Sequence, residues 1–395
     1  MDHKHPRRLR VALVSETWPP EINGVAATVS RFARDLRCRG HAVSVVRPRP
    51  EQYAPGEPDD TLTPGLGIPF YPGLRLGLAS PAALARRWRE RRPDVVYVAT
   101  QGPLGAAALG AAARLAIPVV AGFHTNFHDY SRHYGFGWLA PAASAWLRRF
   151  HRRAWCTVAP TPALAEALGR QGFGRVQVIG RGVDTALFSP ARRSTAMRRA
   201  WGVTGDRLVV LHVGRLAPEK NLGLALEAWR NIRQLRPGAR FVVVGDGPLL
   251  GSLRQREPGI LFAGARRGRD LAACYASADM FLFPSRHETF GNVTIEALAS
   301  GLGVVAFDRA AASLYIRHRV SGMVVPPDQS AEFVAAAANL ARDPGLLHRI
   351  RGNAPAAVGG LDHGFVVDHL EQVLDQAARQ ADRKHDQARH VVLAR

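Results

Sequence analysis

The sequence predicts an α/β protein with two consecutive domains, each built on an open, doubly wound parallel sheet. Two observations carry this prediction. Strand-like runs rich in Val, Leu, Phe and Ala alternate with helical segments along most of the chain. The 395 residues, of which 47% are hydrophobic, also exceed what one ordinary domain holds.

The first domain begins with a short buried strand at residues 9–14, followed by a loop and a helix over 28–39. The apolar residues of this helix share one face, and Gly40 ends it. A strand at 42–46 completes a strand–helix–strand unit of a parallel sheet. The alternation continues with strands at 95–98, 119–121, 157–159 and 176–179 and helices near 81–91, 103–115, 139–153 and 162–171.

A polar, turn-rich stretch at 180–193 separates the first series of elements from a second. The second series has strands at 208–213, 240–244, 260–263, 280–283 and 303–306, and helices at 221–235, 248–256, 269–277 and from about 292. We therefore expect one domain over 1–185, another over 186–365, and a C-terminal helix over 366–395 that is poorly ordered from 380 onwards. Two facing sheets of this kind predict a ligand site in the cleft between them, beyond the carboxyl ends of the strands.

The formal net charge of +21, from 53 basic and 32 acidic residues, indicates an anionic partner. A phosphorylated small molecule, an acidic membrane surface and nucleic acid all qualify, and the alternative is that the arginines form solvated faces. The cysteines Cys38, Cys156 and Cys274 are far apart and form no CxxC pair, so neither a disulfide framework nor a zinc site is expected.

Two apolar stretches bear on localisation. The run that follows the basic N-terminus is too short for a secretion signal. The run at 95–113 is interrupted by Gly102 and Pro103, so it predicts a strand, a turn and a helix in place of a membrane span. These features favour a cytoplasmic protein.

Candidate phosphate ligands follow the first strand of the second domain, in the segment 214–221. Arg215 and Lys220 are the cations of this loop, and both can reach a phosphate group lying over the strand end. The alternative is a pair of surface cations, with Lys220 paired to Glu219.

A second candidate segment, HETFGNVTIEALASG at 287–301, follows the strand at 280–283. Asn292 is a good helix N-cap, so the N–H groups of the preceding turn point to an anion at the positive end of a helix. Glu288 and Glu296 flank this position and can accept hydrogen bonds from the hydroxyls of a sugar or a ribose. The alternatives are a solvated loop acid for Glu288 and a first-turn acid that favours the helix dipole for Glu296.

In the first domain, Gly24 follows the first strand and His124 follows the strand at 119–121. A glycine between strand and helix lets an anion or a sugar approach the backbone, and a histidine at a strand end can bind a hydroxyl or transfer a proton. A metal cluster of His124 with His128, Asp129 and His133 is disfavoured. The chain also contains no DxD motif, so we expect no metal and no other cofactor, with cations and helix dipoles neutralising a leaving group.

Taken together in this order and spacing, GRLAPEKN, VGDGPL and the two glutamates of HETFGNVTIEALASG resemble the retaining nucleotide-sugar glycosyltransferases of family four. ETWPPEINGVAATVSRFARDLRCRGHAVSVVRP and GFHTNFHDYSRHYGFGWL resemble the same family. The bacterial mannosyltransferase and glycolipid-synthesising branch is the most similar, over roughly residues 9–375. The resemblance implies a GT-B fold, in which two Rossmann-like domains face a cleft and the C-terminal one holds most of the donor.

The resemblance also implies roles for individual residues. Arg215, Lys220 and Gly24 would bind the donor diphosphate together with the backbone of Gly291, Asn292 and Val293. Glu288, Phe290, Gly291 and His124 would hold the donor sugar, Glu296 would bind the ribose, and Glu288 and His124 would act closest to the reacting carbon. The donor favoured by the resemblance is GDP-mannose, with UDP-glucose or UDP-glucuronate as the alternative. The implied acceptor is a hydroxyl of a lipid or of a lipid-linked glycan, and the sequence gives no indication of an oligomeric state.

Two segments depart from the family pattern. Gly303 stands where proline is usual, and DRAAASLYI after Phe307 lacks the usual acid near its end, which leaves the donor-side specificity open. The segment 146–153 mixes aromatic residues and arginines at helical spacing, so we expect it to rest on the anionic inner surface of a membrane.

Three other functions compete with glycosyl transfer. A glycosidase also uses two carboxylates but carries no phosphate-binding loop. A nucleic-acid-binding protein would fit the charge, yet no recognition motif supports it, and we expect no nucleic acid as a partner. A GT-B sugar-nucleotide epimerase or phosphorylase is less favoured by the two glutamates and the histidine loop.

Overall fold

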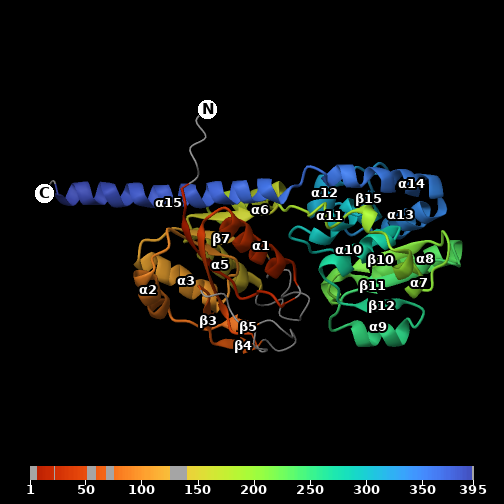
Figure 1. The fold of residues 1–395 in the computed structure, drawn as a ribbon, viewed down its shortest axis with the longest axis horizontal. Helices are drawn as coiled ribbons and strands as arrows, with labels where there is room; N and C mark the ends of the chain where they lie inside the picture. Colours follow the sequence, from red (N-terminus) through yellow and green to blue (C-terminus); the bar gives the residue numbers. More distant parts are fainter. Residues whose placement is uncertain (1–6, 22, 51–58, 68–74, 125–139, 394–395) are drawn as a thin grey trace. The chain divides into compact units, whose positions relative to one another are not determined.

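The chain divides into two compact units in the computed structural model, which describes residues 7–21, 23–50, 59–67, 75–124 and 140–393 (Figure 1). Unit 1 comprises residues 1–180 and 364–395, and unit 2 comprises residues 181–363. The chain therefore returns to the first unit at its C-terminal end, whereas the sequence placed that end in a separate segment.

Unit 1 contains a seven-stranded sheet in the order β3-β2-β1-β6-β7-β8-β9, and every neighbouring pair is parallel. Its runs of Val and Ala suit strands that are buried on both faces. The strands are β1 (Arg10–Val14), β2 (Ala42–Pro48), β3 (Thr61–Thr63), β6 (Val95–Val98), β7 (Val119–Gly122), β8 (Cys156–Ala159) and β9 (Val176–Val178). A separate antiparallel pair is formed by β4 (Gly65–Gly67) and β5 (Arg75–Gly77).

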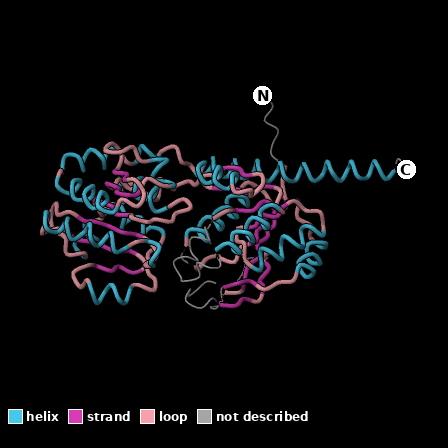
Figure 2. Tube along the Cα trace, turned by 180° about the vertical axis from the view of Figure 1, so that it is seen from behind, coloured by secondary structure: helices cyan, strands magenta, loops and turns pink. Residues whose placement is uncertain are grey.

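Helices cover both faces of the sheet of unit 1, as the tube in Figure 2 shows. One face packs against α1 (Gly24–Cys38) and the first part of α15 (His363–Leu393). The other face packs against α2 (Pro81–Glu90), α3 (Pro103–Arg114) and α5 (Ala140–Arg152). The remaining helix of this unit is α6 (Pro162–Arg170).

Helix α15 begins near the predicted start of the C-terminal helix and continues to Leu393. The poor order expected from residue 380 stays a prediction. The apolar residues of α15 up to Ala378 belong to the core of unit 1, because Leu370, Leu374 and Ala377 pack against the same face as α1. Burial of this stripe supplies the stability that an isolated helix lacks.

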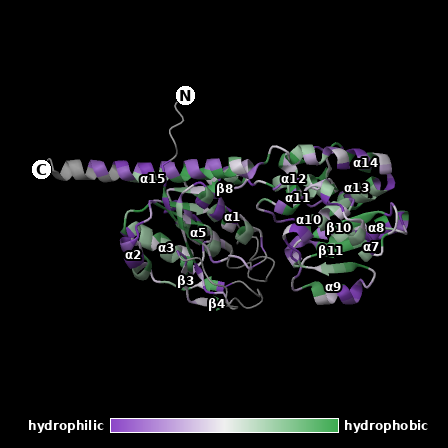
Figure 3. Ribbon diagram, in the orientation of Figure 1, coloured by the Kyte–Doolittle hydropathy of each residue, from purple (hydrophilic) through white to green (hydrophobic). Residues whose placement is uncertain are grey.

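Unit 2 contains a six-stranded parallel sheet in the order β12-β11-β10-β13-β14-β15. Figure 3 shows hydrophobic colouring on strands such as β11, whereas α9 is hydrophobic at one end and hydrophilic at the other. The strands are β10 (Val209–Val213), β11 (Arg240–Val244), β12 (Leu261–Gly264), β13 (Met280–Phe283), β14 (Gly303–Phe307) and β15 (Met323–Val325).

The helices of unit 2 also form two layers. One face of the sheet packs against α8 (Leu222–Leu235), α9 (Leu250–Arg256), α13 (Ser330–Arg342) and α14 (Pro344–Asn353). The other face packs against α10 (Gly268–Ser277), α11 (Asn292–Ala299) and α12 (Ala310–Tyr315). The short α7 (Thr195–Ala200) and three 3-10 turns complete the structure over the described residues: η2 (Pro190–Arg192), η3 (Pro218–Lys220) and η4 (Pro355–Val358).

Candidate functional site

The candidate site of unit 2 lies where its sheet changes direction. After β10 the chain builds β11 and β12 on one side, and it then returns to build β13, β14 and β15 on the other side. The loops that follow β10 and β13 therefore leave the same edge of the sheet on adjacent strands. In open α/β sheets this switch point is where ligands bind.

An ion pair joins these two loops. The Lys220 ammonium contacts Oε1 of Glu288, and the Ser285 hydroxyl donates to the same oxygen over 2.8 Å. The amide of Asn221 donates to the carbonyl of Pro284 over 3.2 Å and so holds the loops together a second time. The side chains of Lys220 and Glu288 are only 17% and 15% exposed. Both alternatives for this region are therefore wrong, since Lys220 is not paired with Glu219 and Glu288 is not a solvated acid.

Arg215 has an acidic neighbour of its own. Its Nη1 lies 3.5 Å from Oε1 of Glu219, whose side chain is 1% exposed. The other oxygen, Oε2, is buried and has no hydrogen-bond partner among the residues that the structure describes. The positive charge of Arg215 therefore offsets the negative charge of the buried Glu219 carboxylate.

Glycines let a neighbouring loop approach the Arg215 loop closely. Gly245 follows β11 with φ +146°, and a Cβ atom there would lie 1.9 Å from the carbonyl oxygen of Gly214. Gly247 has φ +157°, and its Cβ would lie 2.5 Å from the carbonyl oxygen of Leu216. The VGDGPL segment thus acts as a tightly packed connector that supports the loop after β10.

The start of α11 is one residue earlier than the sequence predicts. Gly291 is the cap residue, in the left-handed region with φ +86°, and Asn292 is the first residue of the helix. A glycine has no side chain to cap the helix, so the N–H groups of Asn292 and Val293 are left for an external acceptor at the positive helix end. Phe290, which precedes this position, is buried and packs edge-on against Tyr315.

Glu296 is the fifth residue of α11 and so is not a first-turn acid. It accepts a hydrogen bond of 3.0 Å from the hydroxyl of Tyr275, which is fully buried. The burial of Tyr275 and the nearby Glu296 carboxylate together raise the pKa of the phenol well above its usual value. Tyr275 therefore remains a donor at neutral pH and orients Glu296.

A buried histidine lies beneath the ion pair, and the sequence reasoning missed it. His212 sits on β10, and its Nδ1 donates to the carbonyl of Leu282 over 2.9 Å. Burial lowers the pKa of His212 to about 4, so the imidazole is neutral at pH 7. The apolar pattern of 208–213 had indicated only a strand, and nothing in it distinguishes this histidine from a core residue.

In unit 1, Gly24 is the first residue of α1, directly after the cap residue Asn23. The Asn23 side chain accepts a 2.8 Å hydrogen bond from the Ala26 N–H. Nearby, the hydroxyl of Thr17 donates to Glu21 over 2.6 Å, and burial raises the pKa of Glu21 to about 7. The loop after β1 is therefore held by polar contacts of its own residues.

His124 lies just beyond the end of β7 and is buried. Its Nε2 lies 2.8 Å from the hydroxyl of Tyr97. Gly122 makes room for this pair, since a Cβ atom there would lie 2.4 Å from Nε2 of His124. His128, Asp129 and His133, the other members of the disfavoured metal cluster, lie outside the described residues.

Glu16 is another residue of the site edge that the sequence reasoning missed. It follows β1 and accepts a 3.0 Å hydrogen bond from the N–H of Leu104 at the start of α3. Gly102 permits this contact, because a Cβ atom there would lie 2.0 Å from the carboxylate. Burial raises the pKa of Glu16. The carboxylate acts as a cap for α3 that comes from a distant part of the chain, which no local spacing predicts.

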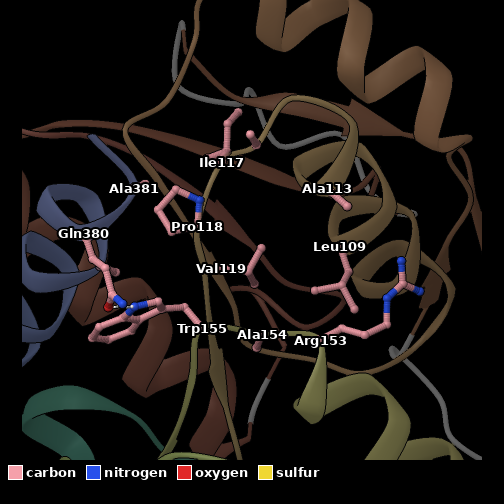
Figure 4. A pocket seen from close by; sticks show the side chains of 12 residues that line it. Leu109, Ala113, Ile117, Pro118, Val119, Arg153, Ala154, Trp155, Gln380 and Ala381 are labelled. Carbon is pink, nitrogen blue, oxygen red and sulfur yellow. Dashed lines mark hydrogen bonds between the residues drawn. The ribbon is translucent and has the colours of Figure 1, made fainter. Parts of the chain in front are cut away.

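A groove of about 280 Å³ lies elsewhere on unit 1 (Figure 4). Its lining includes Pro118 and Trp155, which directly precede β7 and β8, and Gln380 of α15, which accepts a hydrogen bond from the Trp155 indole over 2.6 Å. The groove is therefore at the amino edge of the sheet, opposite the edge that carries Gly24 and His124.

Comparison with solved structures identifies the class of fold. The chain is similar to a sucrose-phosphate synthase from Thermosynechococcus elongatus, with a TM-score of 0.77, 18% identity, and coverage of 93% of this chain and 99% of that one. It is also similar to the HepE protein of Anabaena in complex with UDP-glucose, with a TM-score of 0.73, 21% identity, and coverage of 93% and 100%. Two parallel-sheet domains of this kind define the GT-B class, as the sequence predicted.

Comparison of the sequence defines the family. The model described as Glycosyltransferase Family 4 matches residues 22–187, and that described as Glycosyl transferases group 1 matches residues 207–343. A GDP-mannose-dependent alpha-mannosyltransferase of Mycobacterium tuberculosis is 38% identical over 331 residues, which are 80% of this chain and 84% of that protein. An alpha-monoglucosyldiacylglycerol synthase of Acholeplasma laidlawii is 27% identical over 88% of this chain and 92% of that protein. The chain belongs to the family-four glycosyltransferases, and it is a hexosyltransferase that uses a nucleotide sugar.

Proposed function

We propose that the enzyme transfers mannose from GDP-mannose to a hydroxyl of a lipid or lipid-linked glycan, with retention of the anomeric configuration. Relatives named GDP-mannose-dependent alpha-mannosyltransferases, at 32% to 40% identity, support this donor. The observation that carries the proposal is the meeting of Lys220, Glu288 and the open start of α11 at one sheet edge.

The donor diphosphate binds to Arg215, Lys220 and the N–H groups of Gly291, Asn292 and Val293 in this proposal. Two cations and a positive helix end offset the charge of a diphosphate, and the guanidinium of Arg215 adds paired donors. These groups neutralise the leaving group without a metal ion, and cofactor independence stays a prediction from the sequence.

Carboxylates recognise the two ends of the donor. Glu288 accepts hydrogen bonds from the hydroxyls of the sugar, beside the backbone of Phe290 and Gly291, and Glu296 accepts those of the ribose. The contact between Tyr275 and Glu296 supports the second role, because the buried phenol holds the Glu296 carboxylate in place. The roles of Gly24 at the diphosphate and of His124 at the sugar rest on the family resemblance.

In this proposal the chemical step uses no protein nucleophile, as the family resemblance implies. The acceptor oxygen attacks the anomeric carbon on the face from which the diphosphate departs. The bond from the anomeric carbon to the phosphate oxygen breaks, a new glycosidic bond forms, and the acceptor proton passes to the departing diphosphate. His124 and Glu288 hold the sugar during this exchange.

UDP-glucose or UDP-glucuronate is the second candidate donor. The relative that is named an alpha-monoglucosyldiacylglycerol synthase supports a glucosyl donor. A thermal-shift panel of GDP-mannose, UDP-glucose and UDP-glucuronate decides between the donors. We expect the largest rise in melting temperature with GDP-mannose, and equally small shifts with all compounds would contradict the proposal.

Substitution of Glu288 tests the site. Glu288→Ala is expected to abolish transfer while the protein stays folded. The change removes a side chain that binds the donor sugar and leaves the hydrophobic cores intact. Glu257→Ala is the matched control, since Glu257 is also 15% exposed and also forms an ion pair, with Arg230, but lies outside the site. Retained turnover in Glu288→Ala would remove Glu288 from the donor site.

We also propose that the enzyme is cytoplasmic and works at the inner membrane surface. None of the helices in the described ranges is long and apolar enough to cross a bilayer. Helix α5 exposes Trp146, Arg148, Arg149 and Arg152, a mixture that suits an anionic lipid surface.

A further inference from the structure

The Lys220–Glu288 ion pair joins two residues that the proposed function assigns to different parts of the donor. Lys220 binds the diphosphate and Glu288 binds the sugar in that proposal, yet in the structure each is the partner of the other. Both side chains are mostly shielded from water, so the attraction between them is screened less than that of a surface pair.

The groups that surround the pair contribute little charge. The Phe283 ring centroid lies 5.6 Å from Nζ of Lys220, and the Ser285 hydroxyl is a neutral donor to Glu288. His212 beneath is neutral at pH 7, because burial lowers its pKa to about 4. The neighbouring cation, Arg215, has Glu219 as its own acidic neighbour. Glu288 is therefore the acid that balances Lys220.

This arrangement makes Glu288 a competitor of the diphosphate. A phosphate group that approaches Lys220 meets a carboxylate of like charge already bound to the same ammonium. A complete donor compensates for this repulsion, because its sugar hydroxyls donate hydrogen bonds to the carboxylate. A nucleoside diphosphate without the sugar offers no such compensation.

We infer that the Lys220–Glu288 pair distinguishes the donor from the nucleoside diphosphate product, an inference that rests on the proposed function. While the sugar is present, its hydroxyls occupy Glu288, and Lys220 is available to the diphosphate. After transfer the donor sugar is no longer present, so Glu288 pairs with Lys220 again. The affinity of the site for the diphosphate then falls. The pair thus limits product inhibition and favours product release.

Calorimetric titration of GDP and of GDP-mannose into the wild type and Glu288→Gln tests this inference. The amide keeps the size of the side chain and can still accept from Ser285, but it carries no charge. We expect Glu288→Gln to bind GDP about 10-fold more tightly than the wild type, a gain of about 1.4 kcal/mol. Binding of GDP-mannose should not tighten, so the preference for the donor over GDP should collapse.

Two further variants show whether the effect acts through Lys220. In a Lys220→Met background, the added Glu288→Gln change should leave GDP affinity unchanged, because no ammonium is left to release. Glu257→Gln, which alters an ion pair elsewhere, should bind GDP like the wild type. Melting temperatures without ligand confirm that each variant is folded.

The outcomes separate the inference from the proposed function. Wild-type protein that binds GDP-mannose, together with a Glu288→Gln variant that binds GDP no more tightly, would overturn the inference alone. Equal tightening in the presence and absence of Lys220 would also overturn it. Wild-type protein that binds neither GDP-mannose nor any other nucleotide sugar of the panel would overturn the proposed function and the inference together.

Discussion

Arg215 and Glu219 show how a cation that the proposed function assigns to the donor can also support the fold. Glu219 is 1% exposed, and the contact with Arg215 offsets part of the cost of burying its charge. Under the proposed function, removal of Arg215 therefore has two consequences: it takes a hydrogen-bond donor from the diphosphate, and it leaves a buried carboxylate without its cation. The two consequences are separable by mutation.

Arg215→Ala is expected to weaken donor binding by roughly 10- to 100-fold, as the loss of a charge-assisted hydrogen bond of about 1.5–3 kcal/mol implies. It should also lower the melting temperature. The double variant Arg215→Ala/Glu219→Gln should recover the melting temperature but not the affinity, because the amide needs no counterion. Titration of GDP-mannose and thermal melting check both quantities. A double variant that recovers affinity would exclude Arg215 from the donor site.

His212 predicts a pH dependence of stability. Its pKa is about 4 in the folded protein and about 6.5 in an unfolded chain. Between these values the unfolded chain binds a proton that the folded chain does not, so the free energy of unfolding falls as the pH drops. One such group contributes about 1.4 kcal/mol per pH unit within this window, and nothing further above pH 7.

Urea unfolding of the wild type and His212→Gln between pH 7 and pH 5 measures this contribution. The variant should lose less stability over the window, because its amide does not titrate. His318→Gln is the control, since exposed His318 also contacts a backbone carbonyl, that of Val324. Equal pH dependence in the wild type and His212→Gln would contradict the assignment.

At the scale of elements, α15 is anchored to unit 1 by a buried polar cluster. Glu371 contacts Nε2 of His41 over 2.9 Å and Nη1 of Arg39 over 2.8 Å. The His41 ring in turn accepts from the N–H of Leu9, next to β1. The cluster therefore links the last helix to the first strand of the sheet.

Glu371→Ala should destabilise unit 1 by about 1–3 kcal/mol, because it leaves the buried imidazole of His41 without the partner of its Nε2. Asp368→Ala is a matched control, since Asp368 also pairs with Arg39 but is 48% exposed. The control should cost less than about 1 kcal/mol. Denaturant unfolding of the two variants gives the comparison, and equal losses would show that burial does not govern this anchor.

The strands of both sheets were predicted from the sequence to within two residues, except β3 and β15, which the sequence analysis missed. Runs such as 95–98 and 280–283 are bounded by turn residues, and their order fixes which loops share an edge. The loops after β10 and β13 could be placed side by side for this reason. The ion pair within these loops could not be predicted. Glu219 is adjacent to Lys220 in the sequence, whereas the pairing of Lys220 with Glu288 depends on how two loops that are distant in the sequence pack together.

Helices with weak local signals were also missed. The segment 310–353 forms α12, α13 and α14, but α12 and α13 begin without a side-chain cap and are rich in alanine. The sequence shows the helical period of the apolar residues in α15, but it does not show which sheet the helix packs against. An amphipathic pattern shows that a face is buried and gives no information about the surface that buries it.

For the whole molecule, the net charge of +21 raises the question of whether total charge or its position governs membrane binding. The basic face of α5 combines Arg148, Arg149 and Arg152 with the exposed Trp146. Each basic residue near an anionic surface contributes about 1 kcal/mol, and an aromatic residue adds an interfacial contact. The position of the charge should therefore matter more than its total.

The variant Arg148→Glu/Arg149→Glu/Arg152→Glu should lose most binding to anionic phospholipid vesicles at low salt. The variant Arg233→Glu/Arg254→Glu/Arg256→Glu undergoes the same change of net charge on exposed positions of unit 2 and should bind nearly as well as the wild type. Cosedimentation at several salt concentrations measures both, with transfer to a water-soluble acceptor as the control for an intact enzyme. Equal losses in the two variants would mean that only total charge matters, and an absence of wild-type binding to these vesicles would exclude the membrane role of α5.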